Sequence, residues 1–235
     1  MKLELTIPTT LDEIPLMHYQ KFMEVSKNST DDEFVAQKMI QIFCGIELNE
    51  VVKISFNDMV DLVNHFNKLF SEIPKLKPTF KIKDLELGII PNFDKITWEE
   101  YIELEAQFKE FDTFHKAMAV LYRPVVEKNK HNQYLIAPFN NVEEFGDLMK
   151  YTPLSVALSS HLFFWNLEKE LLTATISYLE KMLMKMTKVN KAILAKKLNL
   201  QNNGDGISQF MQSQKEILEN LMKSSEQNYL PSLTF

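Results

Sequence analysis

The sequence is poor in residues suited to covalent or redox chemistry. Cys44 is the single cysteine among 235 residues, so no disulfide can form within the chain. This thiol stands in the apolar stretch IQIFCG, which indicates a buried side chain. A reactive cysteine needs an activating charge or helix terminus nearby, and the sequence shows neither. We therefore expect Cys44 to be buried and inert.

Arginine is also almost absent. Arg123 is the only arginine among the 26 lysine and arginine residues, a bias that codon usage in an AT-rich genome accounts for. Two interpretations of Arg123 stay open. It is either a surface charge at a helix end or the partner of a carboxylate, since the guanidinium fork matches a carboxylate in bidentate geometry.

Turn formers, charge of one sign and long apolar runs are scarce too. The 5 Gly and 9 Pro argue against a many-turn β-sandwich and against broad disorder. The net charge of −6 gives no reason to expect nucleic-acid binding. The most apolar stretch, 154–165, is too short to span a bilayer, and the N-terminus lacks a signal-peptide core. We expect a protein kept in a cytoplasm or packed into a particle assembled there.

Recognisable catalytic motifs are missing. The sequence contains no Gly-rich phosphate loop, no G-x-S-x-G and no H-E-x-x-H, and none of its 5 histidines has a second His or Cys at ligand spacing. The acidic run 99–110 could in principle hold paired carboxylates for acid–base catalysis or Mg²⁺, but a solvated helix face is the favoured interpretation. We expect no enzyme activity and assign no catalytic residue, cofactor or metal ligand.

The chain does contain a short sequence motif that occurs twice, called here the repeated phrase. Residues 7–19 read IPTTLDEIPLMHY and residues 90–101 read IPNFDKITWEEY. The shared pattern Ile-Pro, then Asp-x-Ile-x-x-x-x-Tyr, places Asp12, Ile14 and Tyr19 opposite Asp94, Ile96 and Tyr101. Each copy is expected to end an extended piece and to begin a helix. At these helix starts, Trp98 and either Leu16 or Met17 are expected to pack on the core.

Local signals predict a mainly helical chain. Capping boxes at 30–33 and 97–100 and a Ser cap at 55 predict helix starts, and Gly45 predicts a helix end. An alternating pattern predicts a strand at 2–7, a hairpin turning at Lys83-Asp84 and a short strand at 134–139. Further helices are expected over 111–122 and 141–150, with a polar loop at 127–133. From Thr152-Pro153, roughly 34 residues without Gly or Pro predict a helix about 50 Å long.

These elements predict the fold class mainly α (α+β), with one or two small β-hairpins, a long helix and a C-terminal amphipathic helix and tail. We expect three regions: an N-terminal helical unit at 1–88, a second helical unit at 89–201, and a linker, helix and tail at 202–235. The basic segment 181–197 is either a solvated helix face or a patch for phosphate or an acidic partner.

The C-terminal region has the strongest pattern for partner binding. The stretch 207–223 has an amphipathic helical pattern behind the linker NNGDG, and such a helix must bury its apolar face on its own domain or in another chain. The apolar residues expected to contact a partner are Phe210, Met211, Ile217, Leu218, Leu221, Met222, Tyr229, Leu230 and Phe235.

Several blocks resemble a family of small proteins from tailed bacteriophages, particularly crAss-like phages of gut Bacteroidales. They are the second D-x-I-x-x-x-x-Y copy, KAMAVLYRP at 116–124, the strand YLI at 134–136 and the segment from Pro153 to Trp165. The resemblance covers roughly residues 3–180 and carries no catalytic residue. It implies a small tail or virion protein, similar in size to tail-assembly chaperones and to cargo or tail-lumen proteins.

Three functions follow as hypotheses. The first is a non-enzymatic virion component, tail-associated or carried as cargo, that binds other virion or tail proteins. The second is a tail-assembly chaperone absent from the mature particle, for which the 17 Phe and 12 Met supply adaptable apolar surface. The third is a host-directed enzyme or inhibitor with a carboxylate site in the acidic run. We expect protein partners, with homo-oligomer formation left open, and no small-molecule substrate, membrane or specific nucleic acid.

Deletion of residues 207–235 tests the C-terminal prediction. The remaining core should stay folded and lose partner binding, because the deleted residues carry the predicted contact face. Thermal melting followed by circular dichroism and co-purification with virion proteins measure the two effects. Loss of the cooperative melt would mean that the tail belongs to the core.

Overall fold

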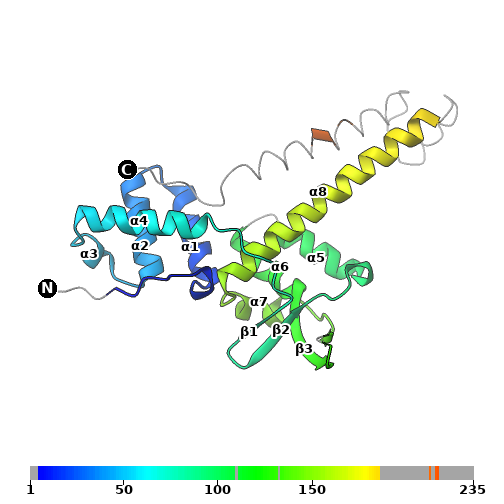
Figure 1. Cartoon of the computed structure of the whole chain (residues 1–235), viewed down its shortest axis with the longest axis horizontal. Coiled ribbons are helices and arrows are strands. Elements are labelled where there is room, and N and C mark those ends of the chain that lie inside the picture. Colours follow the sequence, from blue (N-terminus) through cyan, green and yellow to red (C-terminus); the bar gives the residue numbers. More distant parts are fainter. Residues whose placement is uncertain (1–4, 109–110, 132, 186–211, 213–214, 217–235) are drawn as a thin grey trace. The chain divides into compact units, whose positions relative to one another are not determined.

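A computed structural model describes residues 5–108, 111–131, 133–185, 212 and 215–216 (Figure 1). The chain forms two compact units, and their boundary falls within α8 (Leu154–Lys185), after His161. The other helices and strands whose bounds follow belong to the first unit. The predicted fold class is confirmed, since the chain is mainly helical with one small four-stranded antiparallel sheet and a long helix.

The elements of the first unit alternate between helical and extended stretches. The helices are α1 (Leu16–Asn28), α2 (Asp32–Cys44), α3 (Leu48–Val51), α4 (Phe56–Phe70), α5 (Trp98–Phe108), α6 (Phe114–Leu121) and α7 (Glu143–Met149). The strands are β1 (Thr79–Ile82), β2 (Leu85–Ile89), β3 (Tyr122–Lys128) and β4 (Tyr134–Ile136). Three 3₁₀ turns, η1 (Leu11–Glu13), η2 (Phe93–Lys95) and η3 (Phe111–Thr113), precede α1, α5 and α6.

An aromatic core joins α1, α2 and α4, which lie together in Figure 1. The α4 side chains that the sequence spaces as one helical face are buried, and Phe66 and Phe70 both contact Phe43 of α2, with ring centroids 5.4 and 5.1 Å apart. Phe22 of α1 meets the same ring at 5.3 Å. Each buried Phe contributes about 1.5–3 kcal/mol, so this cluster is a principal stabilising element of these helices.

The helix ends follow the local signals closely. The predicted Ser55 cap is confirmed, because its hydroxyl oxygen accepts a hydrogen bond from the Asp58 amide at 3.2 Å. Gly45 ends α2 in the left-handed conformation, with φ of 67°, as predicted. The predicted capping box at 30–33 is wrong by one residue. Asp31 is the cap instead, since its carboxylate accepts from the Phe34 amide at 3.1 Å.

Cys44, the last residue of α2, is buried as predicted. Burial raises the pKa of its thiol to about 11, because the charged thiolate is poorly solvated there. At neutral pH the side chain is therefore a neutral thiol that packs as a small apolar group.

The sheet has the order β1-β2-β3-β4, with every pair antiparallel. The predicted hairpin is confirmed, and Lys83 at its turn has φ of 52°. Residues 88 and 89, which flank the predicted region boundary, both lie in β2, and β2 pairs with β1 on one side and β3 on the other.

Two extended segments differ from expectation. The predicted helix at 111–122 ends at Leu121 and the predicted loop at 127–133 is partly strand, because β3 pairs with β2 through Tyr122–Ile89 and with β4 through Lys128–Tyr134. Conversely, residues 5–7 of the predicted N-terminal strand are not in a strand. The segment is held instead by a side chain, with His65 Nε2 2.7 Å from the Pro8 carbonyl oxygen.

A close approach of Tyr134 to β2 requires glycine at position 88. A Cβ atom there would stand 2.5 Å from Tyr134 Cε2, closer than real Cβ contacts. The ring lies across Gly88 because its hydroxyl donates a hydrogen bond to the Ile89 carbonyl oxygen at 2.9 Å. The glycine therefore makes room for the Tyr134 ring of β4 against β2.

Substitution Gly88→Ala should lower the free energy of unfolding by about 1–3 kcal/mol, as overpacking does. Gly146→Ala is the matched control, since its Cβ would meet only Lys116 Cγ at 3.7 Å in α7. Removing a helical glycine there should be neutral or stabilise by about 0.5–1 kcal/mol. Urea denaturation measures both, and equal effects would contradict the packing role of Gly88.

Candidate protein-interaction surface

The C-terminal residues predicted to bind a partner lie outside the described residues. These are Phe210, Met211, Ile217, Leu218, Leu221, Met222, Tyr229, Leu230 and Phe235. Most of the basic segment 181–197 lies outside them as well. Both predictions stay predictions. In the second unit, Glu180 of α8 pairs with Lys215 at 2.7 Å.

Helix α5 begins with the predicted capping box, which the structure confirms. The Thr97 amide donates to Glu100 Oε2 at 2.7 Å, and the Glu100 amide donates to the Thr97 hydroxyl at 3.2 Å. Two amide groups at the helix start are thereby satisfied by two side chains. The start of α5 is consequently fixed in place.

The same carboxylate also makes a buried ion pair. Glu100 Oε1 lies 2.8 Å from a terminal nitrogen of Arg123, the second residue of β3. Glu100 is 4% and Arg123 7% exposed, so the expected solvated face is wrong for Glu100, and the carboxylate-partner interpretation of Arg123 is the right one. Burial lowers the pKa of Arg123, and the Glu100 charge opposes that shift.

The ion pair sets the rotation of α5 about its axis. Glu100 and Leu104 are its buried residues and face inward. At 100° per residue, the opposite side carries Trp98, Ile102 and, at its edge, Tyr101. Trp98 is 74%, Ile102 47% and Tyr101 45% exposed. The prediction that Trp98 packs on the core is therefore wrong.

These three side chains form what we call the α5 face. The Trp98 and Tyr101 rings are stacked, with centroids 5.6 Å apart and planes at 22°. Acidic residues adjoin the face, because helical spacing places Glu99 and Glu103 along one side of it and Glu105 one turn beyond Tyr101 and Ile102. A preformed aromatic platform with an acidic border is a surface suited to binding a protein segment.

The two copies of the repeated phrase share their local structure. In each, a 3₁₀ turn precedes a helix, and the Ile amide, Ile14 or Ile96, donates to the carbonyl oxygen three residues earlier, at 3.4 and 3.2 Å. The helices then begin at equivalent positions, Leu16 and Trp98. The predicted role of the phrase as a helix start is confirmed in both copies.

Their surroundings differ. In the first copy Leu16 and Tyr19 are fully buried, as expected for Leu16. The Leu16 amide donates to the Thr152 carbonyl oxygen at 2.9 Å, and the Tyr19 ring contacts Phe111 at 5.3 Å. The equivalent residues of the second copy are Trp98 and Tyr101, which lie on the α5 face. The second copy thus exposes the positions that the first copy covers.

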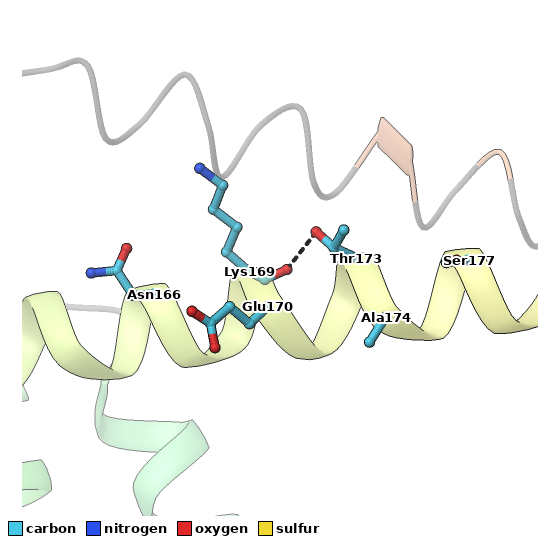
Figure 2. Close-up of a pocket in the computed structure, with 6 residues that line it drawn as sticks. All are labelled: Asn166, Lys169, Glu170, Thr173, Ala174 and Ser177. Carbon is cyan, nitrogen blue, oxygen red and sulfur yellow. Dashed lines mark hydrogen bonds between the residues drawn. The ribbon is translucent and has the colours of Figure 1, made fainter.

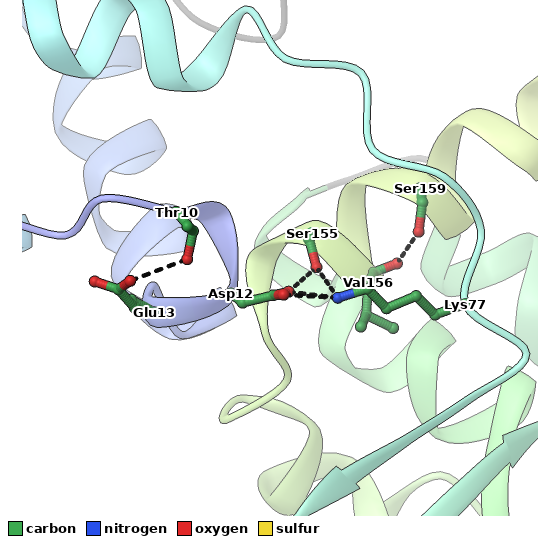
Figure 3. Close-up of polar contacts among 7 residues, drawn as sticks. All are labelled: Thr10, Asp12, Glu13, Lys77, Ser155, Val156 and Ser159. Atoms are coloured by element: carbon green, nitrogen blue, oxygen red, sulfur yellow. Dashed lines mark hydrogen bonds and ion pairs between the residues drawn. The ribbon is translucent and has the colours of Figure 1, made fainter.

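Asp12, the aspartate of the first copy, links two distant segments of the chain (Figure 3). Asp12 Oδ1 is 2.7 Å from the Lys77 ammonium and also accepts from the Ser155 hydroxyl at the start of α8. The hydrogen bond from Lys77, followed by that from Ser155, lowers the pKa of Asp12. The contacts join segments distant in sequence, so this cluster holds the fold rather than presenting a ligand site.

Two hollows lie elsewhere. One of about 1000 Å³ runs beside the N-terminal segment and α4, lined by Leu5, Ile7, Glu50, Asp58, Asp61 and His65 among others. Its Glu50 and Asp58 carboxylates already bind the Glu47 amide and the Ser55 hydroxyl. The other, of about 490 Å³, follows α8 in the second unit (Figure 2), where Thr173 donates to the Lys169 carbonyl oxygen at 2.7 Å.

Within the described ranges, no group of three or more His, Cys, Asp or Glu side chains is arranged to hold a metal ion. None of the helices in that part of the chain combines the length and apolar character needed to cross a membrane. No family model, curated protein or solved structure matches the chain. The α5 face is therefore interpreted from its own geometry.

The Glu100–Arg123 pair can be tested separately from the cap, because Gln also works in a capping box. Glu100→Gln should lower the free energy of unfolding by about 3–5 kcal/mol, since Arg123 is then buried without a counter-charge. The double variant Glu100→Gln/Arg123→Met should be less destabilised. Glu99→Gln, on the exposed side of the same turn, is the control and should change stability by no more than about 0.5 kcal/mol. A double variant less stable than Glu100→Gln alone would rule out the charge argument.

Proposed function

We propose that the protein is a non-enzymatic structural component of a tailed-phage particle, associated with the tail or carried as cargo. It binds other virion proteins through exposed helix faces, the α5 face first among them, and through its C-terminal tail. The localisation that follows is the virion, assembled in the bacterial host cytoplasm. Support comes from the resemblance at residues 3–180 and from the α5 face itself.

The α5 face is the single observation that carries the binding role. Isolated exposed apolar residues are ordinary on protein surfaces, but contiguous ones mark interaction sites. Here three large side chains adjoin on one side of one helix, and the opposite side is anchored by a buried ion pair. Anchoring lowers the entropy lost on binding, so such a face is preorganised for a partner.

Size indicates that α5 does not act alone. Its 11 residues span about 16 Å, and a large aromatic side chain buries about 150–250 Å². A stable interface buries about 1,600 Å² in total, so further contacts are needed. The predicted C-terminal contacts are one source of these further contacts.

The first experiment is quantitative mass spectrometry of gradient-purified virions of the encoding phage, compared with the lysate of infected cells. A virion component should be present at a fixed copy number per particle. Abundance in the lysate with none in the particle would overturn the proposal and favour the tail-assembly chaperone.

Complementation with variants tests the face. Trp98→Ala/Tyr101→Ala should lower the copy number per particle at least tenfold while leaving the melting temperature unchanged, since both side chains are exposed. Ile73→Ala, which removes an 83% exposed side chain outside α5, is the matched control and should be incorporated normally. Normal incorporation of the α5 variant would exclude this face from assembly.

A further inference from the structure

We infer that the α5 face binds an amphipathic helix rich in lysine or arginine, supplied by a partner protein other than a second copy of this chain. The inference rests on the proposed function as a protein-binding component and names the chemistry of the partner. It follows from three properties of the face: its exposed stripe, its acidic border and its position in the repeat.

The exposed stripe fixes the shape of the partner. Trp98, Tyr101 and Ile102 stand at positions i, i+3 and i+4, which is the spacing with which one helix contacts another. In the first copy of the repeat, Leu16 and Tyr19 at the equivalent positions are covered by neighbouring elements of the chain. A partner that covers Trp98 and Tyr101 would complete in the second copy the burial that the first achieves internally.

The border fixes the charge of the partner. Glu99 is exposed and Glu103 half-buried, and neither forms an ion pair with any residue that the structure describes. Glu99 and Glu103 therefore place two carboxylates along one side of the apolar centre, and Glu105 adds a third one turn beyond Tyr101. Flanking charges of this kind select a partner helix with the opposite charge, as they do in coiled coils.

The stacked Trp98 and Tyr101 rings also favour a positively charged partner. Trp is the best side chain for a cation–π contact, and its ring is already held by stacking on Tyr101. The described part of the chain shows such contacts elsewhere: the Lys169 ammonium lies 5.4 Å from the centre of the Trp165 ring on α8, and the Lys38 ammonium lies 5.5 Å from that of Phe34 on α2. A lysine or arginine from the partner can therefore lie over Trp98 while its neighbours reach Glu99 and Glu103.

Charge argues against symmetric pairing of two copies through this face. In a two-fold dimer the same patch meets itself, so the carboxylates of one α5 face would meet those of the other. Like charges opposed across an interface are unfavourable, and the chain as a whole has a net charge of −6. The occupant is thus expected to come from a different, basic protein segment.

The test uses the full-length protein with Trp165→Phe, which leaves Trp98 as the only tryptophan. The probe is a synthetic 18-residue helix with Leu at positions i, i+3, i+4 and i+7 and Lys beside them. Its controls are the same peptide with Glu for Lys and a scrambled peptide of equal charge. Binding of the Lys helix should shift Trp98 emission to shorter wavelength, and raising NaCl from 50 to 500 mM should weaken binding at least fivefold.

Variants locate the site. Trp98→Ala, followed by calorimetry, should weaken binding of the Lys helix at least tenfold, and Glu99→Gln/Glu103→Gln about fivefold. The matched control Asp32→Asn/Asp61→Asn removes two exposed charges from α2 and α4 and should leave affinity within twofold. Equal binding of the scrambled or Glu peptide, or an equal effect of the control variant, would overturn the inference.

Sedimentation velocity and cross-linking of the protein alone test the other occupant. Self-association that Trp98→Ala abolishes would make a second copy the occupant and overturn the inference. The virion measurement is independent of these results. Copies in the particle without Lys-helix binding would refute only the partner chemistry, whereas Lys-helix binding without copies in the particle would refute only the virion role.

Discussion

One carboxylate holds together the part of the molecule on which the functional proposal depends. Glu100 closes the first turn of α5 with one oxygen and neutralises Arg123 of β3 with the other. A helix start and a sheet strand are thereby joined at a buried point. Because the carboxylate must face inward to reach Arg123, Trp98 two residues earlier must face outward. The exposed aromatic platform is therefore a consequence of the ion pair, and not of a weak local packing preference.

The two copies of the repeated phrase show that the same local structure can occur with different tertiary contacts. Both copies form a 3₁₀ turn with equivalent hydrogen bonds and begin a helix at the equivalent residue. The first copy forms backbone hydrogen bonds with the 150–154 segment and a ring contact with Phe111. The same short sequence pattern thus gives buried side chains at Leu16 and Tyr19 in one copy and exposed ones at Trp98 and Tyr101 in the other, and the difference is set by contacts distant in sequence.

The difference between local structure and contacts distant in sequence explains what the sequence could predict. Ser55, Gly45, the Lys83 turn and the 97–100 capping box act over three or four residues, so their roles were predictable. The strand β3 was missed because its pairing with β2 depends on residues about 35 positions away along the chain. The burial of Glu100 was missed for the same reason, although the single arginine was a usable signal. The predicted C-terminal contacts lie outside the described residues, and the α5 face, hidden within an acidic run, needed the structure.

The state of Cys44 has a practical consequence for labelling experiments on this protein. With a pKa of about 11 and a buried side chain, its thiol is almost entirely protonated and largely shielded at neutral pH. Cys44 is therefore expected to react only slowly with maleimides and thiol-reactive spin labels. A cysteine introduced at a chosen surface position would be the sole labelling point, so distances and environments can be reported from single sites without first removing a native residue from the core.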